Sequence, residues 1–279
     1  MVGITIQCRM GNQLFQYAFI KALSEKLDTS FFLNDKIEKI IASDYFHLEG
    51  YNPVLNPLKR IYFKLKRGNL FTHQNTVAID AYSDTVLAGL SNQVIYGGYF
   101  QSELFFKNIA DKISGYIRVK EKYKKEFNSL YKNTFSNNKV IAVHIRRGDY
   151  LNLGYWWTEN MGSNNLTLPL DYYMNCLDQL KDKHNHKIIF VSDDIEFVRD
   201  NFGHIKNAEF ASNSMIIDFQ VIMNADVCIL ANSSFAWWAA YLNPKKSKLV
   251  FCPEYWLGFK IKREYPEHII PESWKRVKV

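Results

Sequence analysis

Cysteine is scarce in this sequence and never occurs in the spacing that zinc sites use. The 279 residues include four cysteines, and Cys8, Cys228 and Cys252 stand within apolar runs. A free cysteine in such a run behaves as a small hydrophobic side chain. We therefore expect reduced thiols in a reducing compartment.

Long hydrophobic runs are also missing. No stretch approaches the roughly 18 apolar residues of a membrane span, and the opening sequence MVGITIQCRM lacks a basic region followed by a long apolar core. We expect a cytoplasmic protein whose membrane contact, if it has one, is peripheral and on the inner face. The segment 57–67 predicts a short basic helix ending at Gly68. It can be interpreted as a solvated face or as a contact with an anionic membrane or a lipid-linked acceptor.

Three common enzyme signatures are absent. The chain contains no GxGxxG, no GxxxxGK followed by Ser or Thr, and no GxSxG, which argues against dinucleotide oxidoreductases, P-loop enzymes and hydrolases. The net charge of +7 suits an anionic partner: a nucleotide, a nucleic acid or a membrane surface. Aromatic residues make up 15% of the chain and would suit a carbohydrate or nucleotide site.

What the chain does have is an alternation of strands and helices. It is expected to open with a strand at 2–8, a helix at about 12–27 and a strand at 30–33. The second half has four apolar segments that predict strands, at 139–143, 187–191, 227–231 and 248–252. Helices are expected between them, at 169–183, 194–202, 213–224 and 233–242. This alternation predicts an α/β fold with a doubly wound parallel sheet.

A polar stretch at 134–138 reads as a linker, which divides the chain into domains 1–135 and 136–279. The first domain is irregular in its pattern after residue 35, whereas the second is regular throughout.

Polar residues follow each strand of the second half, where the carboxyl ends of parallel strands share one edge of the sheet. That edge is where ligands bind in open α/β sheets. Arg146 and Arg147 follow the first strand, and a guanidinium fork can hold two oxygens of a phosphate or carboxylate. Because side chains alternate along an extended chain, His144 and Arg146 should share a face, and Arg147 should turn away to pair with a carboxylate.

Two further signatures leave alternatives open. Asp193 and Asp194 could hold a metal together with Glu196, cap the next helix, or accept hydrogen bonds from a base such as guanine; we favour capping by one and ligand binding by the other. Ser233 and Ser234 could cap the last helix or, with the N–H groups of that helix, cradle a phosphate.

Five segments, in the same order along the chain, resemble the motifs of bacterial α-1,2-fucosyltransferases, glycosyltransferase family 11. They are GNQLFQYA at 11–18, GYFQSE at 98–103, HIRRGDY at 144–150, FVSDD at 190–194 and ANSSFAWW at 231–238. Arg9 and Met10 depart from the Gly-Leu that usually precedes the first motif, and the aromatic loop 151–168 is also unlike the family.

The resemblance implies a GT-B-like fold, with two Rossmann-like domains facing across a cleft. The N-terminal domain would lie on the acceptor side and the C-terminal domain would bind GDP-fucose, with the last residues packing back on the N-terminal domain. It implies inverting transfer of L-fucose from GDP-β-L-fucose to the 2-hydroxyl of a β-galactoside or lipid-linked glycan in polysaccharide biosynthesis. It implies no required cofactor, no metal and no nucleic-acid partner. The alternative is a metal-dependent nucleotide-sugar transferase built on Asp193 and Asp194.

The resemblance also assigns roles by position. Arg146 would contact the donor diphosphate, His144 would line the nucleotide pocket, and Asp193 or Asp194 would read guanine. Asn12 would reach the cleft near the fucose. The segment that would lie along the nucleotide diphosphate consists of Asn232, Ser233, Ser234 and Phe235. The candidates for a base that takes the acceptor proton are Asp149, Glu159 and His144.

Overall fold

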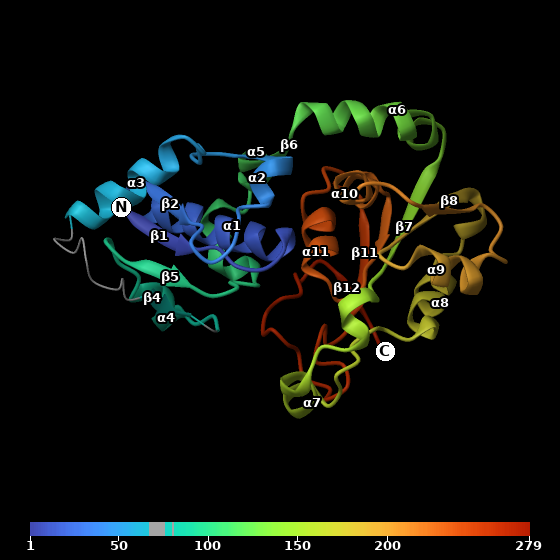
Figure 1. Cartoon of the computed structure of the whole chain (residues 1–279). Helices are drawn as coiled ribbons and strands as arrows, with labels where there is room; N and C mark the ends of the chain where they lie inside the picture. Colours follow the sequence, from blue (N-terminus) through green and yellow to red (C-terminus); the bar gives the residue numbers. More distant parts are fainter. Residues whose placement is uncertain (67–75, 80) are drawn as a thin grey trace. The chain divides into compact units, whose positions relative to one another are not determined.

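The computed structural model describes residues 1–66, 76–79 and 81–279 (Figure 1). The chain forms two compact units, Met1–Lys120 and Glu121–Val279. The division falls fifteen residues before the expected end of the first domain at 135, because residues 134–137 belong to a helix.

The N-terminal unit is built on a four-stranded parallel sheet with the order β2-β1-β5-β4. Its strands are β1 (Val2–Thr5), β2 (Phe31–Asn34), β4 (Thr76–Ala78) and β5 (Ile95–Gly97). The predicted opening of strand, helix and strand is confirmed, with α1 (Met10–Lys26) between β1 and β2. Helix α1 is buried along most of its length, and Phe19 stacks on Phe100 with ring centroids 3.8 Å apart.

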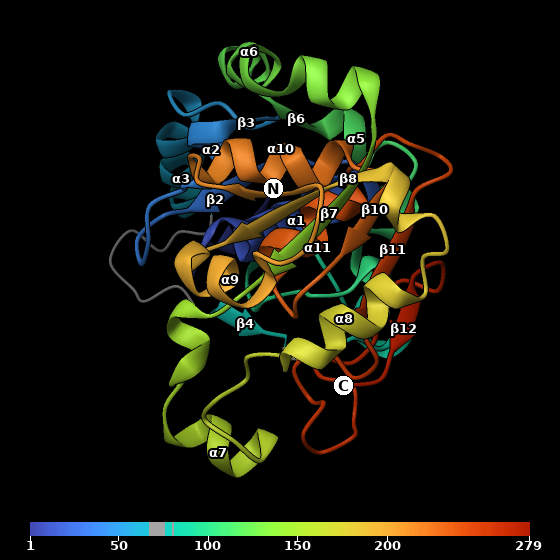
Figure 2. The ribbon, with the colours of Figure 1, turned by 90° about the vertical axis from the view of Figure 1, so that its right-hand side faces the viewer.

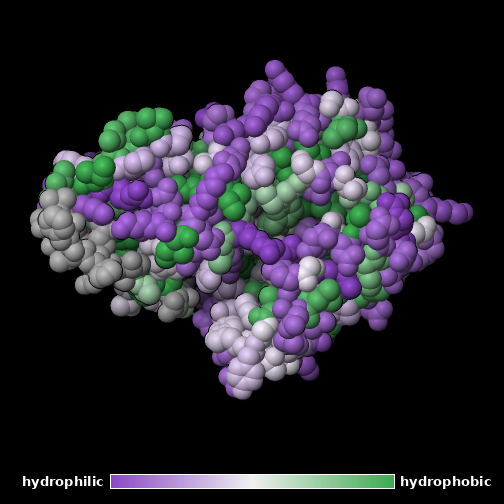
Figure 3. All heavy atoms as spheres, in the orientation of Figure 1, coloured by the Kyte–Doolittle hydropathy of each residue, from purple (hydrophilic) through white to green (hydrophobic). Residues whose placement is uncertain are grey.

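The N-terminal unit also contains four further helices, a 3-10 segment and two further strands among its described residues. They are α2 (Ala42–Tyr45), β3 (Phe46–Leu48), α3 (Leu55–Lys66), α4 (Asp84–Ala88), the 3-10 segment η1 (Glu103–Ile109), α5 (Ile113–Tyr116) and β6 (Ile117–Val119). Strands β3 and β6 pair antiparallel. Helix α3 confirms the basic helix expected near 57–67, although its expected end at Gly68 lies outside the described residues. Apolar side chains gather over α3 at the upper left of Figure 3.

The C-terminal unit begins with α6 (Glu121–Asn137), so the prediction of a linker at 134–138 is wrong. Tyr131 is buried and its hydroxyl accepts from Asn213 Nδ2 at 2.9 Å. The Gln220 Nε2 donates to the Tyr123 carbonyl at 2.9 Å. These bonds attach α6 to the C-terminal unit. The sequence of α6 is mostly polar and only a narrow side of the helix is buried, so the pattern did not predict this attachment.

Six parallel strands form the sheet of the C-terminal unit, in the order β12-β11-β10-β7-β8-β9. They are β7 (Lys139–Ile145), β8 (His186–Ser192), β9 (Ala208–Ala211), β10 (Val227–Ile229), β11 (Leu249–Pro253) and β12 (Lys275–Val277). The predicted doubly wound sheet is confirmed. Strand β12 pairs with β11, so residues 275–277 form the outer strand of this sheet.

Helices cover both faces of that sheet (Figures 1 and 2). Helices α8 (Leu170–Asp178) and α9 (Ile195–Phe202) lie on one face, and α10 (Met215–Asn224) and α11 (Ser234–Tyr241) lie on the other. Shorter segments, η2 (Gly148–Leu151), α7 (Tyr155–Met161) and η3 (Lys183–Asn185), lie in the connections.

Candidate active site

The strand order of the C-terminal sheet creates a switch point between β7 and β10. From β7 the chain crosses to β8 and β9 on one side, whereas from β10 it crosses to β11 and β12 on the other. The Ala231 N–H donates to the His144 carbonyl at 3.0 Å, which joins the two strand ends beyond the regular ladder. Such a switch point is where open α/β sheets bind ligands.

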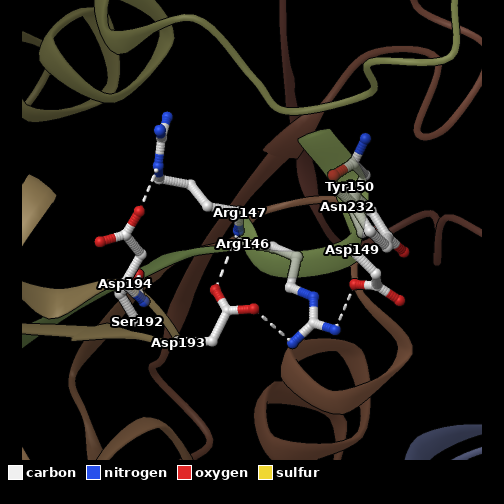
Figure 4. Close-up of polar contacts among 8 residues, drawn as sticks. All are labelled: Arg146, Arg147, Asp149, Tyr150, Ser192, Asp193, Asp194 and Asn232. Carbon is white, nitrogen blue, oxygen red and sulfur yellow. Dashed lines mark hydrogen bonds and ion pairs between the residues drawn. The ribbon is translucent and has the colours of Figure 1, made fainter. Parts of the chain in front are cut away.

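Arg146 leaves the end of β7 between two carboxylates (Figure 4). Its Nη1 is 2.8 Å from Asp193 Oδ2, and its Nη2 donates to Asp149 Oδ1 at 2.5 Å. The side chain is 18% exposed, so the guanidinium is partly shielded but still accessible. The structure therefore brings together three of the predicted site residues.

Arg147 turns away from Arg146, as the alternation of side chains predicts (Figure 4). Its Nε donates to Asp194 Oδ2 at 2.9 Å, and its guanidinium lies 3.3 Å from the centroid of the Phe197 ring. The Asp194 side chain also accepts from the Phe197 N–H at 3.4 Å, as the N-cap of α9. Arg147 and Asp194 thus brace the turn, and the expectation that one aspartate caps a helix is confirmed for Asp194.

Asp193 is held in place by the backbone of the turn. Its Oδ1 accepts from the Arg147 N–H at 2.9 Å. Gly148 has a φ of +22°, and a Cβ at that position would lie 2.3 Å from Asp193 Oδ2. The sequence indicated only that Gly148 allows a turn; the structure adds that it leaves room for the carboxylate that pairs with Arg146.

The N-terminus of α11 lies beside this turn. Ser233 is the N-cap, but its side chain makes no capping hydrogen bond, so simple capping does not account for it. The first N–H groups of a helix have no partners within the helix and carry partial positive charge. Ser233 is buried, and Phe235 in the first turn lies with its ring centroid 5.6 Å from that of His144.

Two polar atoms next to that helix end are buried without a hydrogen-bond partner: His144 Nδ1 and Asn232 Oδ1. Burial, with a smaller contribution from the positive charge of Arg146, lowers the pKa of His144 to about 3, so the imidazole is neutral at neutral pH. Buried polar groups are normally paired, because leaving one unpaired costs free energy. A ligand that forms hydrogen bonds with them would remove that cost.

A loop that sequence reasoning left without a role is attached to the same place. The Tyr150 hydroxyl donates to the Asn232 carbonyl at 3.1 Å, the Asn232 Nδ2 donates to the Leu166 carbonyl at 3.0 Å, and the Leu166 N–H donates to the Tyr150 carbonyl at 2.9 Å. Glu159, a candidate base, is exposed on this loop and accepts from the Tyr155 hydroxyl. Tyr150 is therefore a structural part of the site that its place in the arginine motif alone did not reveal.

Asn12 belongs to the N-terminal unit. It is the third residue of α1, whose N-cap is Arg9, and its Oδ1 accepts from Gln101 Nε2 at 2.7 Å. Sequence reasoning missed its neighbours Gln13 and Gln16, which are both buried. The Gln13 amide bonds to the backbone at Cys8, Lys39 and Ala42.

Neither a metal centre nor a membrane span is found in the part of the chain that the structure describes. Within residues 1–66, 76–79 and 81–279, no three His, Cys, Asp or Glu side chains are placed to hold a metal ion. Across those same residues, no helix combines the length and the apolar character that a bilayer crossing requires.

The fold resembles solved fucosyltransferase structures. The NodZ α-1,6-fucosyltransferase soaked with GDP-fucose matches with a TM-score of 0.51 and 14% identity, over 87% of this chain and 92% of that one. POFUT1 in complex with GDP-fucose matches with a TM-score of 0.54 and 11% identity, over 90% and 97%. At this identity the likeness shows the fold, which is α/β and GT-B-like as expected.

Residues 1–263 match the family described as Glycosyl transferase family 11, and the chain belongs to this family. The Escherichia coli O-antigen biosynthesis glycosyltransferase WbnK is 27% identical, over 89% of this chain and 92% of that protein. The Escherichia coli alpha-1,2-colitosyltransferase is 26% identical, over 96% of both. Galactoside alpha-(1,2)-fucosyltransferase 1 of Alouatta belzebul is 23% identical, over 84% of this chain and 63% of that protein. The resemblance seen in the five motifs is confirmed, and the enzyme is placed among the fucosyltransferases.

Proposed function

We propose that this enzyme transfers L-fucose from GDP-β-L-fucose to the 2-hydroxyl of a β-galactoside in an acceptor glycan, with inversion at the anomeric carbon. One observation carries the donor assignment: buried, unpartnered polar atoms of His144 and Asn232 stand beside the N-terminus of α11, next to Arg146. An anion with hydrogen-bond donors, such as a nucleoside diphosphate, matches all three features. The solved relatives that hold GDP-fucose and the relatives named for α-1,2 transfer support the choice of sugar and hydroxyl.

The leaving GDP gathers negative charge as the bond to the sugar breaks. Arg146 and the N–H groups at the start of α11 would stabilise that charge. In this structure, however, the guanidiniums of Arg146 and Arg147 face one more carboxylate than they can neutralise, because Asp149, Asp193 and Asp194 all pair with them. Binding of a diphosphate therefore requires Arg146 to release a carboxylate.

Asp149 is the carboxylate that we expect to be released. Asp193 is fixed by the Arg147 N–H and by the space at Gly148, whereas Asp149 lies on the short η2 segment and its side chain is 40% exposed. We assign to Asp149 the role of taking the acceptor proton once the diphosphate replaces it at Arg146.

His144 is a poor base, because both burial and Arg146 disfavour its protonated form. We therefore assign His144 to binding of the nucleotide and Asp149 to uptake of the acceptor proton. Glu159 is the remaining candidate for the base. Asp149→Asn should raise GDP affinity, because it removes the carboxylate that competes with the diphosphate for Arg146, and it should lose turnover. Unchanged turnover in a folded variant would rule Asp149 out.

The reaction, as proposed, needs no metal, because Asp193 and Asp194 are already engaged by the two arginines and the backbone. Full activity in excess EDTA is expected. Activity that is lost in EDTA and restored by a divalent cation would favour the alternative, a metal-dependent transferase built on these two aspartates.

A thermal-shift series with GDP-fucose, GDP-mannose, UDP-galactose and CMP-sialic acid tests the donor, followed by product analysis on β-galactosides. We expect the GDP-sugars to stabilise the protein most and GDP-fucose to give the product. Equal shifts from all four nucleotide sugars would contradict a guanine-reading site. One relative is a colitosyltransferase. Transfer of colitose in preference to fucose would therefore change the assignment of the donor sugar and leave the assignment of the site unchanged.

A further inference from the structure

Helix α3 and the residue before it carry six large apolar side chains that are exposed to solvent. The exposed fractions range from 48% to 75% for Val54, Leu55, Leu58, Ile61, Tyr62 and Leu65. We call these six residues the α3 stripe. Single exposed hydrophobic residues are ordinary, but a contiguous exposed patch marks an interaction surface.

The α3 stripe points away from the N-terminal unit. At the helical spacing of 100° per residue, its members fall within an arc of about 120°, centred opposite Asn56 and Phe63. Those two residues are the buried side of the helix: Phe63 packs on Phe32 with ring centroids 5.0 Å apart, and the Asn56 amide exchanges hydrogen bonds of 2.8 and 2.9 Å with the Leu33 backbone. The stripe is therefore not part of the core of this unit.

Basic residues border the α3 stripe on both sides, and the helix contains no acidic residue. Lys66 lies along one border and Lys64 along the other, by the same helical spacing. Lys59, on the same border as Lys66, is turned to its own unit, because its Nζ donates to the Gly50 carbonyl at 3.3 Å. The positive charge of Lys36, with that of Arg60, lowers the pKa of Lys64. An apolar stripe between cationic borders is typical of a helix that lies in the plane of a membrane surface, where its lysines meet anionic headgroups.

We propose that helix α3 docks the enzyme on an anionic lipid bilayer, with the α3 stripe inserted among the acyl chains near the headgroups. Charge decides between this partner and a second copy of the chain. A symmetric contact between two α3 stripes would place their lysine borders against each other, with no acidic residue on either helix to pair with them. An anionic lipid bilayer offers acyl chains to the apolar side chains of this surface and negative headgroups to its lysines.

Co-sedimentation with vesicles tests the proposal, using phosphatidylcholine alone and phosphatidylcholine mixed with phosphatidylglycerol. The full chain should bind the mixed vesicles and bind phosphatidylcholine weakly. The double variant Leu58→Glu/Ile61→Glu should lose about 100-fold in apparent affinity, because it removes two apolar anchors and adds two repelled charges. Lys64→Ser/Lys66→Ser should lose about 25-fold, at roughly fivefold for each charge.

The matched control is Leu130→Glu, which changes a single exposed leucine on α6, 57% exposed, and should leave binding unchanged. All variants should keep the wild-type melting temperature and the wild-type rate on a soluble acceptor, which separates this proposal from the assignment of the reaction. Equal vesicle binding by wild type and Leu58→Glu/Ile61→Glu would overturn it. A wild-type dimer that this variant converts to a monomer would also overturn it, in favour of a second copy of the chain.

Discussion

The glutamines that follow β1 and the charged residues that follow β7 are used in opposite ways. After β1, Gln13 is buried and its amide is satisfied: Nε2 donates to the Cys8 and Lys39 carbonyls, both at 2.9 Å, and Oε1 accepts from the Ala42 N–H at 3.0 Å. Gln16 likewise bonds to the backbone at Gln7 and Gly98. These side chains hold loops in place and leave little capacity for a ligand.

The edge of the C-terminal sheet is charged and incompletely paired. Arg146 is shared between Asp149 and Asp193, while His144 Nδ1 and Asn232 Oδ1 are buried without partners. The comparison teaches that the hydrogen bonds of a motif residue show what that residue is used for. Satisfied groups support the architecture. Buried unsatisfied atoms also occur at the ends of β1 and β2, at Thr5 Oγ1 and Asn34 Oδ1, so it is the position of His144 and Asn232 beside Arg146 and the start of α11 that marks the place where an anionic ligand is expected.

The largest effect should come from Arg146→Ala. Removing a hydrogen-bond donor aimed at the charge that develops on the leaving GDP costs roughly 100- to 1,000-fold in rate. The melting temperature should change little. Arg147→Ala is the matched control, because Arg147 braces Asp194 and stacks on Phe197, so its stability loss should be large relative to its rate loss. Measuring turnover, GDP affinity and melting temperature for both variants tests this prediction. A near-normal Arg146→Ala enzyme would overturn the assignment.

Gln13→Ala should show the reverse pattern in the N-terminal unit. It leaves three backbone groups without their partner, so we expect a loss of about 3 kcal/mol in the free energy of unfolding. GDP affinity of the folded protein should stay unchanged. Chemical denaturation and calorimetric titration measure the two quantities, and weakened GDP binding without loss of stability would erase the contrast between the units.

Gly148→Ala should weaken nucleotide binding through Asp193. The added Cβ would lie 2.3 Å from Asp193 Oδ2, so the carboxylate must move and Arg146 with it. Overpacking of this kind costs roughly 1–3 kcal/mol, and we expect GDP affinity to fall by about tenfold. Gly154→Ala, at another positive φ but with open space around the added carbon, is the control for backbone strain. Equal losses in the two variants would mean that Asp193 is not the cause.

The smallest effect concerns Asp218, a buried and partnered group in the C-terminal unit. Burial raises the pKa of Asp218 to about 6, although its hydrogen bond from Asn213 opposes this. A raised folded pKa means that the stability gained by protonation is present at low pH and is lost as the pH rises through about 6. Asp218→Asn should therefore stabilise the protein by about 1–2 kcal/mol at pH 8 and by less near pH 4. Melting curves at both pH values test this, and an equal effect at both would contradict the shifted pKa.

Much of the C-terminal fold could be predicted from the sequence because its strands are short apolar runs bounded by polar signatures. The segments expected at 139–143 and 187–191 became β7 and β8 with small extensions. The domain boundary could not be predicted, because α6 buries only a narrow side, including Phe127 and Tyr131, and its polar end resembles a linker.

The sequence predicted which residues form the site, but it did not predict the role of each one. The alternation of side chains along β7 predicted that Arg146 and Arg147 point in different directions. The sequence left Asp193 and Asp194 interchangeable, because their roles depend on Gly148, Phe197 and the two arginines in three dimensions. Gln13 was missed because its partners are backbone atoms of loops whose positions the sequence does not give.

The most direct test of the account is GDP binding and thermal stability of His144→Phe. The substitution keeps a ring of similar size and removes the buried, unpartnered Nδ1. Because an unsatisfied buried polar atom costs free energy that only a ligand would offset, the account predicts an unchanged or higher melting temperature together with at least about tenfold weaker GDP binding. Unchanged GDP affinity, or a loss of stability that accounts for the loss of binding, would contradict it.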